Sequence, residues 1–186
     1  MKRITLIMLF ATMGMLCFSR NPKIVNIPAH EARYNNQIDP IDINTISKQF
    51  VKYLSSLKWF NKSKKYFWLI SPKLLNKTDE HLQTSIIANK ISSKLLNKGI
   101  MLKDGNIILN SILQDPYLKK MNTWQQLETK FKISYIITGQ VTNIRKHDNE
   151  RIKVSYTFTF KVIKVKNKHV VCIKQIIITK EYSKSR

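Results

Sequence analysis

The sequence is poor in cysteine, glycine and acidic residues, and each shortage argues against a class of protein. Two cysteines, Cys17 and Cys172, cannot build a disulfide framework in a chain of 186 residues. The 4 glycines form no phosphate-binding loop and no dinucleotide fingerprint, and no G-x-S-x-G nucleophile motif occurs. With 11 acidic residues a paired-carboxylate hydrolase is possible, but nothing in the sequence marks one. Together these shortages favour a protein that has no catalysis of its own.

Potential metal ligands are also scarce. His81 follows Asp79 and Glu80, but adjacent positions of a helix do not converge on one ion, so helix capping is the favoured interpretation. Cys172 lies in an expected strand with no histidine nearby, which favours a buried structural thiol over a nucleophile. The 4 histidines show no metal-ligand spacing to one another or to a cysteine. We therefore expect no metal, no cofactor and no catalytic residue.

Positive charge is what the sequence has in excess. Its 33 basic and 11 acidic residues give a net charge of +22. The lysines are spread along the chain, which favours a solvated basic surface over a dedicated polyanion site. The alternative stays open: a basic surface or secreted module would bind anionic polymer, lipid headgroups or glycans through its lysines. A nucleic-acid partner is not expected, because Tyr156, Phe158 and Phe160 share the inward face of an alternating strand.

The chain begins with a basic segment followed by an apolar one. Met1-Lys2-Arg3 precedes an apolar run from Ile4 to Phe18, the pattern of a secretory signal. The run is shorter than the roughly 20 residues that a membrane-spanning helix needs. Cys17 is a candidate for lipidation, while cleavage after Ser19 and an uncleaved anchor are the alternatives. We predict that residues 1–19 are a signal peptide or lipoprotein leader that directs the protein to the cell envelope and its membrane.

Two further segments follow the leader. Residues 20–40 contain three prolines and show no periodicity, which predicts an extended linker. Residues 41–186 are long enough, and apolar enough at 43% hydrophobic content over the whole chain, to form a single globular domain. Because helical and strand-like segments mix there without regular alternation, we predict an α+β fold, with helices packed on a mixed or antiparallel sheet.

The first part of the domain is predicted to be mostly helical. Apolar spacings of three and four residues indicate a helix over Ile41–Leu57, and a wholly apolar run at Tyr66–Ile70 fits a central strand that is covered on both faces. Three more helices are expected: one with Thr78 as N-cap that ends at Gly99, one over Asn106–Leu113, and one with a Thr123–Gln126 capping box that runs to Phe131; a short strand is expected at Met101–Lys103.

Three strand-like runs from Ile133 to Tyr182 end the chain. The middle run alternates strictly between apolar residues, from Val154 to Val162, and polar residues, which is typical of a strand with one buried face. Short polar turns separate the runs, so they are predicted to form a three-stranded antiparallel meander. Gly139, in the first of these strands, either allows a bulge or close approach by a ligand, or makes room for an aromatic side chain opposite.

The last strand has apolar residues on both sides. If Val170, Cys172, Ile176 and Ile178 point inward, then Val171, Ile173 and Ile177 point outward. Three large aliphatic side chains beside a polar strand face would be an unusual exposure. We favour cover by a helix of the same chain; the alternative is an edge that binds a partner or a second copy. On that alternative, Val171, Ile173 and Ile177 are the candidate partner-binding residues.

Two separated motifs resemble those of LpoB-type penicillin-binding-protein activators. SYIITGQVTNIRK and YTFTFKVIKVKNKHVVCIKQIIITK are similar to the end of that family, and NKTDEHLQT is similar to its N-R-T-x-E-H-I-D-T segment. The match covers roughly residues 42–182, with Lys168 and Cys172 standing where the family usually has Gly and Trp. The matching positions are Asn76, Thr78, Glu80, His81, Thr84, Tyr135, Gly139, Tyr156, Phe158, Thr159, Ile178 and Lys180.

This resemblance implies a function in cell-wall synthesis. It implies a non-catalytic envelope protein that docks onto a bifunctional penicillin-binding protein and activates it in peptidoglycan synthesis. It also implies a periplasmic protein anchored at the outer membrane, which would agree with lipidation of Cys17. Two other classes remain: the basic binding module described above, and an accessory subunit similar by fold to TolB or to curli-assembly proteins.

Overall fold

Three long antiparallel strands form the centre of the structure. The computed structural model describes residues 24–26, 38–114, 122–147 and 151–183. Strands β5 (Ile133–His147), β6 (Arg151–Lys164) and β7 (His169–Ser183) follow one another in the sheet, with Val141 opposite Phe158 and Phe158 opposite Ile176. The antiparallel pairing of β5 with β6 and of β6 with β7 confirms the predicted meander. Strict alternation along β6 determines the register, since a shift by one residue would expose its apolar side chains.

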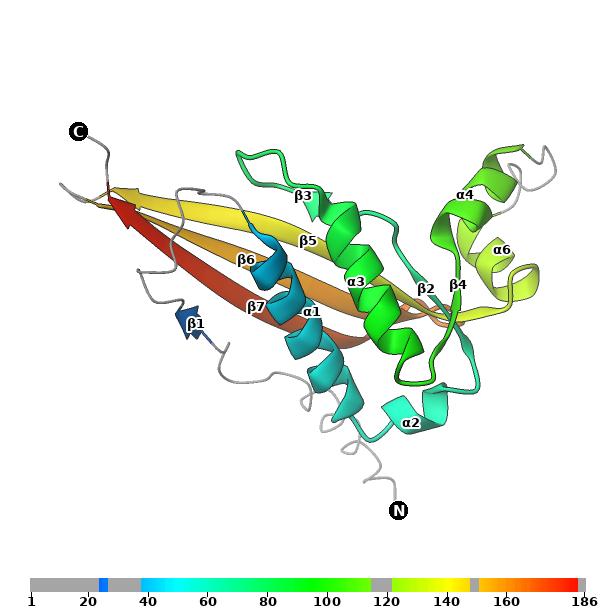
Figure 1. Cartoon of the computed structure of the whole chain (residues 1–186). Helices are drawn as coiled ribbons and strands as arrows, with labels where there is room; N and C mark the ends of the chain where they lie inside the picture. The colour runs from blue at the N-terminus through cyan, green and yellow to red at the C-terminus, as the bar shows by residue number, and fades with distance from the viewer. Residues whose placement is uncertain (1–23, 27–37, 115–121, 148–150, 184–186) are drawn as a thin grey trace, which may run out of the picture.

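Shorter strands extend the meander on both sides into a seven-stranded sheet of order β1-β7-β6-β5-β2-β4 (Figure 1). Strand β2 (Phe67–Ile70) lies parallel to β5, and β4 (Met101–Lys103) lies parallel to β2. The two-residue β3 (Leu75–Asn76) also pairs with β5. Strand β1 (Ile24–Asn26), which lies within the predicted linker, pairs in parallel with β7.

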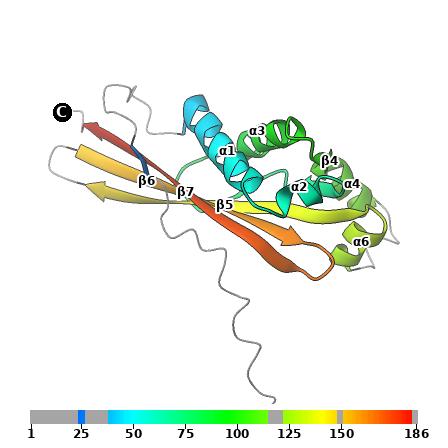
Figure 2. The same ribbon diagram turned by 90° about the horizontal axis from the view of Figure 1, so that it is seen from below.

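Two helices cover one face of the sheet. Helix α1 (Pro40–Ser55) and helix α3 (Thr84–Leu96) lie side by side above it, with the one-turn helix α2 (Phe60–Ser63) beyond α1 (Figures 1 and 2). Phe50 of α1 stacks on Phe160 of β6, with ring centroids 4.4 Å apart. Tyr156, Phe158 and Phe160 are fully buried here, so the prediction that they form core is confirmed.

Two helices cover part of the opposite face, near β2 and β5. Helices α4 (Gly105–Gln114) and α6 (Thr123–Thr129) pack on Leu69 of β2 and Ile136 of β5 in a second hydrophobic cluster. Side chains alternate along β2, so Trp68 and Ile70 join the main core while Leu69 joins the second cluster. The predicted central strand, covered on both faces, is therefore confirmed.

Two predicted helix starts are wrong. Helix α3 begins at Thr84 and not after Thr78, because residues 77–83 form a loop in which Asp79 and Glu80 bind side chains of β5 and β6. Ile87, Ile91 and Leu95 form the buried side of this helix, whereas Ile86 and Leu96 are exposed. Helix α6 is capped by Asn122, whose side chain accepts a hydrogen bond from the backbone N–H of Trp124, one residue before the predicted cap.

The N-terminal leader is outside the part of the chain that the structure describes, and so is Cys17. Helix α1 begins at Pro40, close to the predicted boundary of the domain. Within the described residues, the structure holds no helix that combines the length and the apolar character required to cross a membrane.

Candidate functional site

The loop between β3 and α3 carries the NKTDEHLQT motif and contacts the strands that carry the second motif. Within the loop, Asn76 donates a side-chain hydrogen bond to the carbonyl of Glu80 at 2.7 Å. The hydroxyl of Thr78 bonds to the Asn76 side-chain oxygen at 2.7 Å. Thr84 at the loop's end is buried and donates to the carbonyl of Leu74 at 2.9 Å. Asn76, Thr78 and Thr84 of the first motif therefore hold the loop in its folded conformation.

The acidic residues of this loop bind the meander. Asp79 accepts hydrogen bonds from Asn143 and from Arg145, whose Nε lies 2.8 Å from Asp79 Oδ2. Glu80 pairs with Arg145 through one carboxylate oxygen, and the other accepts a hydrogen bond from the Tyr156 hydroxyl at 2.6 Å. The interpretation of Asp79 and Glu80 as helix-capping residues is therefore wrong: they fasten a loop to β5 and β6.

The electrostatics of this cluster follow from its contacts. Hydrogen bonds from Asn143 and Arg145 hold the pKa of Asp79 below its usual value. Burial, together with the hydrogen bond to the Glu80 carboxylate, raises the pKa of Tyr156 far above its usual value. Tyr156 therefore stays a neutral hydrogen-bond donor and Asp79 stays an anion over the physiological pH range. The cluster positions the loop, and it contains no pair of groups poised to exchange a proton near neutral pH.

A second motif residue, Lys180, connects β7 to the start of α1. Its ammonium lies 2.6 Å from Asp42 and 3.2 Å from Asp39. Asp42 is fully buried, so the cation compensates a charge that would be costly alone. Burial raises the pKa of Asp39, but hydrogen bonds from the Asp42 backbone and the charge of Lys180 outweigh it, so the pKa is lowered overall. No sequence pattern indicates that Asp39 and Asp42 belong to this contact.

The candidate partner-binding residues do not share one environment. Val171 is half-buried and packs against the main core, whereas Ile173 is 38% exposed. Ile177 is half-buried and pairs with Ile24 of β1. The register of the β6–β7 pair shifts between Val162, which lies opposite Cys172, and Ile163, which lies opposite Val170. Val171 lies at this shift, so its side chain departs from the regular inward–outward alternation of the strand.

This shift overturns part of the expected pattern of the last strand. Val170, expected to point inward, is 47% exposed. Neither hydrophobic cluster of the described residues includes Ile173 or Ile177, so the favoured cover by a helix of the same chain is not found there. Of the three candidate residues, Ile173 is exposed to solvent, whereas Val171 and Ile177 are half-buried.

Cys172, Gly139 and Lys168, which the sequence patterns marked, have structural roles. Cys172 is buried as a free thiol, as expected. Gly139 lies opposite Phe160, and an added Cβ would meet that ring at 3.1 Å, which favours room for an aromatic over a ligand approach. Lys168, which replaces the family's usual Gly, takes a left-handed backbone with φ of 58°, so the turn geometry persists without glycine. Among the described residues no group of His, Cys, Asp and Glu could hold a metal ion.

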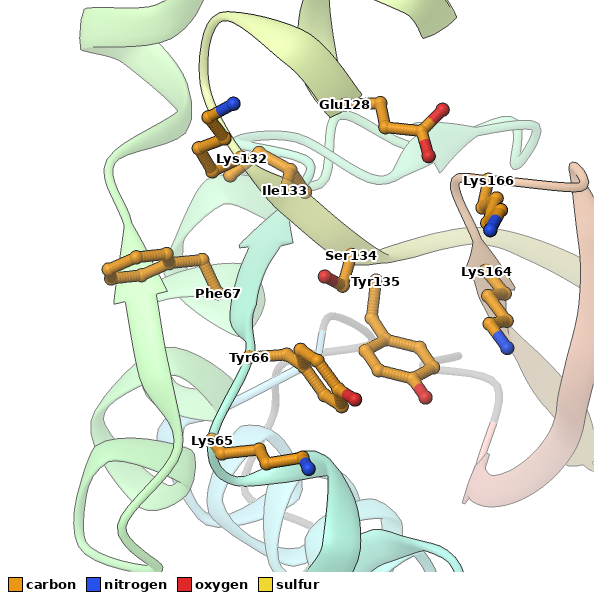
Figure 3. A pocket seen from close by; sticks show the side chains of 10 residues that line it. All are labelled: Lys65, Tyr66, Phe67, Glu128, Lys132, Ile133, Ser134, Tyr135, Lys164 and Lys166. Carbon is orange, nitrogen blue, oxygen red and sulfur yellow. The ribbon is translucent and has the colours of Figure 1, made fainter.

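A hollow of about 530 Å³ lies beside the starts of β2 and β5 and the end of β6 (Figure 3). Tyr66 and Tyr135 line it with their ring centroids 6.2 Å apart. Burial raises the pKa of Tyr135, with Tyr66 adding to the shift, so its hydroxyl is a neutral donor. The remaining charged lining consists of Glu128 and four lysines, Lys65, Lys132, Lys164 and Lys166.

Comparisons with known proteins agree with the motifs. The family model described as "Peptidoglycan-synthase activator LpoB" matches residues 42–175. The LpoB C-terminal domain from Escherichia coli is 13% identical, with a TM-score of 0.52 over 73% of this chain and 97% of that chain. That of Salmonella enterica is 8% identical, with a TM-score of 0.45 over 73% and 93%.

The solution structure of Escherichia coli LpoB is 11% identical, with a TM-score of 0.47 over 96% of this chain and 91% of that chain. Among curated proteins no sequence matches this chain. At 13% identity, the Escherichia coli domain supports the fold alone. The family model, in contrast, matches more than half of the chain. The chain therefore belongs to the LpoB family of peptidoglycan-synthase activators.

Proposed function

We propose that this protein docks onto a bifunctional penicillin-binding protein and raises its rate of peptidoglycan synthesis without catalysing a reaction itself. The observation that carries the proposal is the family match over residues 42–175. The folded loop of residues 76–84 supports it, because the motif residues there bind one another and the sheet rather than converging on a reactive centre.

The open part of the sheet is our candidate for the docking surface. Ile173 projects from the same face as Lys161, which lies opposite it on β6, and Thr159 lies opposite Gln175 on that face. An exposed aliphatic residue within a polar, flat strand surface resembles the small apolar centre and polar rim of a non-obligate protein interface. We assign Ile173 to the centre of this surface, with Val171 and Ile177 supporting the strand from partly buried positions.

The location of the protein is part of the same proposal. A basic start followed by an apolar run at residues 4–18 would direct export, and lipid on Cys17 or an uncleaved leader would hold the chain at a membrane. The folded domain would then face the periplasm, where it can meet the periplasmic part of a synthase. Lipid labelling of the wild type that disappears in Cys17→Ala would support lipidation, and an unlabelled wild type would reject it.

A binding titration at several salt concentrations tests the docking. The full chain, purified in a non-ionic detergent and immobilised, is titrated with each purified bifunctional synthase of the same organism. Docking through an apolar centre should persist when ionic strength rises, whereas binding through lysines alone should weaken steeply. Ile173→Lys should abolish binding, and the control Ile144→Lys, an exposed position at the distal end of β5, should leave it unchanged.

Two outcomes would count against the proposal. If no synthase binds, the docking function is rejected. If a synthase binds but the affinity falls steeply with salt and ignores Ile173→Lys, the interaction belongs to the basic surface, which is the behaviour of a module for anionic partners.

A further inference from the structure

The hollow of Figure 3 gathers positive charge that the described residues do not neutralise. Lys65 precedes β2, Lys164 ends β6 and Lys166 lies in the following turn, so three separate positions of the chain contribute lysines to the lining of one hollow. Within the described ranges, none of these three lysines forms an ion pair with a carboxylate. Glu128 lines the same hollow from α6 and carries the opposing charge, and Lys132 balances it. The hollow therefore keeps a net positive charge of about three lysines.

Aromatic and hydroxyl groups lie between these ammonium groups. In Figure 3 the hydroxyls of Tyr66 and Tyr135 lie between Lys65 on one side and Lys164 on the other. Tyr135 is held in place by Trp68, whose ring centroid is 4.8 Å away. Tyr66 is 42% exposed, and the Lys65 ammonium lies 5.3 Å from its ring centroid. The hollow thus combines a fixed phenol, an accessible ring and cations at its rim.

We propose that this hollow binds a small anion that carries a phosphate group attached to a ring. Lys65, Lys164 and Lys166 surround the phosphate, because ammonium groups act as point charges for phosphate oxygens. The hydroxyls of Tyr66 and Tyr135 donate hydrogen bonds to it, and the accessible ring of Tyr66 packs against the ring of the ligand. The volume of about 530 Å³ lies within the range of small-molecule sites.

Two features distinguish this site from the general basic coat of a chain with net charge +22. The lysines come from different elements and border one hollow, whereas lysines spread along a helix border none. The site also contains a partly buried tyrosine fixed by tryptophan stacking, which a solvated surface does not require. The inference does not depend on the proposed function, since it concerns a small ligand and not synthase docking.

Calorimetric titration of the purified full chain in non-ionic detergent tests the site, with inorganic pyrophosphate and uridine diphosphate as probes. Uridine diphosphate should bind more tightly than pyrophosphate, because only it has a ring. The double variant Lys65→Ala with Lys164→Ala should weaken both probes by roughly tenfold, since each exposed charge contact contributes a modest free energy. Tyr66→Leu removes the ring together with one hydrogen bond to the phosphate, so it should weaken uridine diphosphate by a larger factor than pyrophosphate.

The matched control removes two charges elsewhere. Lys48 and Lys52 are exposed on α1, far from the hollow in the sequence and on another element, so Lys48→Ala with Lys52→Ala should change binding by less than about twofold. An unchanged thermal midpoint for each variant shows that the fold is intact. Equal weakening by both double variants, or no binding of either probe to the wild type, would overturn the site.

Discussion

At the scale of single residues, Tyr156 is the link between the core and the loop of the first motif. Its ring is fully buried between the sheet and the helices, and its hydroxyl reaches Glu80 at 2.6 Å. Arg145 holds the same carboxylate from the neighbouring strand. One phenol and one guanidinium therefore fix a loop that lies more than sixty positions away in the sequence.

Replacing Tyr156 with Phe removes this hydrogen bond and keeps the ring. Hydrogen bonds to charged groups contribute about 1.5–3 kcal/mol, so we expect the free energy of unfolding to fall by about 1.5 kcal/mol, because Arg145 still pairs with Glu80. Urea unfolding measures the change. The control Tyr66→Phe removes an exposed hydroxyl and should cost less than about 0.5 kcal/mol. Equal losses for the two variants would contradict the anchoring role of Tyr156.

Asp39 gives the folded state a dependence on acid pH. Because its pKa is lowered on folding, its charged form favours the folded state, and this contribution is present above the usual value of 3.8 and is lost as pH falls through the folded pKa. Asn at this position still caps α1. Asp39→Asn should therefore cost about 0.5–1 kcal/mol at neutral pH, for the lost attraction to Lys180.

The pH series separates this effect from a change in capping. The difference in unfolding free energy between wild type and Asp39→Asn should begin to shrink as the pH falls past the usual value of 3.8, and it should approach zero below the lower folded pKa, where the carboxyl is neutral in both states. A difference that stays constant down to that range would show that the ion pair with Lys180 is not its source.

At the scale of elements, the register shift in the β6–β7 pair decides which side chains of β7 meet solvent. Val171 packs against the core and Ile173 is exposed, although both were expected on one outer face. Val171→Lys should lower the free energy of unfolding by about 2 kcal/mol, and Ile173→Lys by less than about 1 kcal/mol. Urea unfolding of the two variants measures this contrast. Similar large losses for both would restore the interpretation that a helix covers the strand.

Local patterns were sufficient to predict much of the fold. Alternation along β6 and the polar turns around it predicted the meander, and the apolar run of β2 predicted a strand covered on both faces. Both are properties of neighbouring residues, so they can be read from short windows of sequence. The resemblance supplied the identity of the motif residues, but not their contacts.

The features that were missed depend on distant residues. Thr78, Asp79 and Glu80 resemble a helix start, yet Arg145 and Tyr156 bind the carboxylates and hold the segment as a loop. The shift near Val162 leaves no mark in the sequence, and one residue of slip changes the face of every side chain beyond it. The pairing of Lys180 with Asp42 joins opposite ends of the domain. Such contacts become visible only when the chain is folded.

At the scale of the whole molecule, the sheet has one covered face and one that is covered only in part. Helices α1 and α3 lie over the first, whereas α4 and α6 cover the second only beside β2 and β5 (Figure 2). The hollow with its lysines and tyrosines lies at the end of β6, beside α6. The docking surface that we propose on the open strands and the hollow that we propose for a small ligand are therefore separate parts of the domain.

The decisive measurement for the proposed activation is the rate of glycan polymerisation by a purified bifunctional penicillin-binding protein. The account predicts that adding the full chain in detergent raises this rate severalfold, that the chain alone polymerises and crosslinks nothing, and that Ile173→Lys loses the stimulation while it remains folded. An unchanged rate for every bifunctional synthase of the organism would contradict the account.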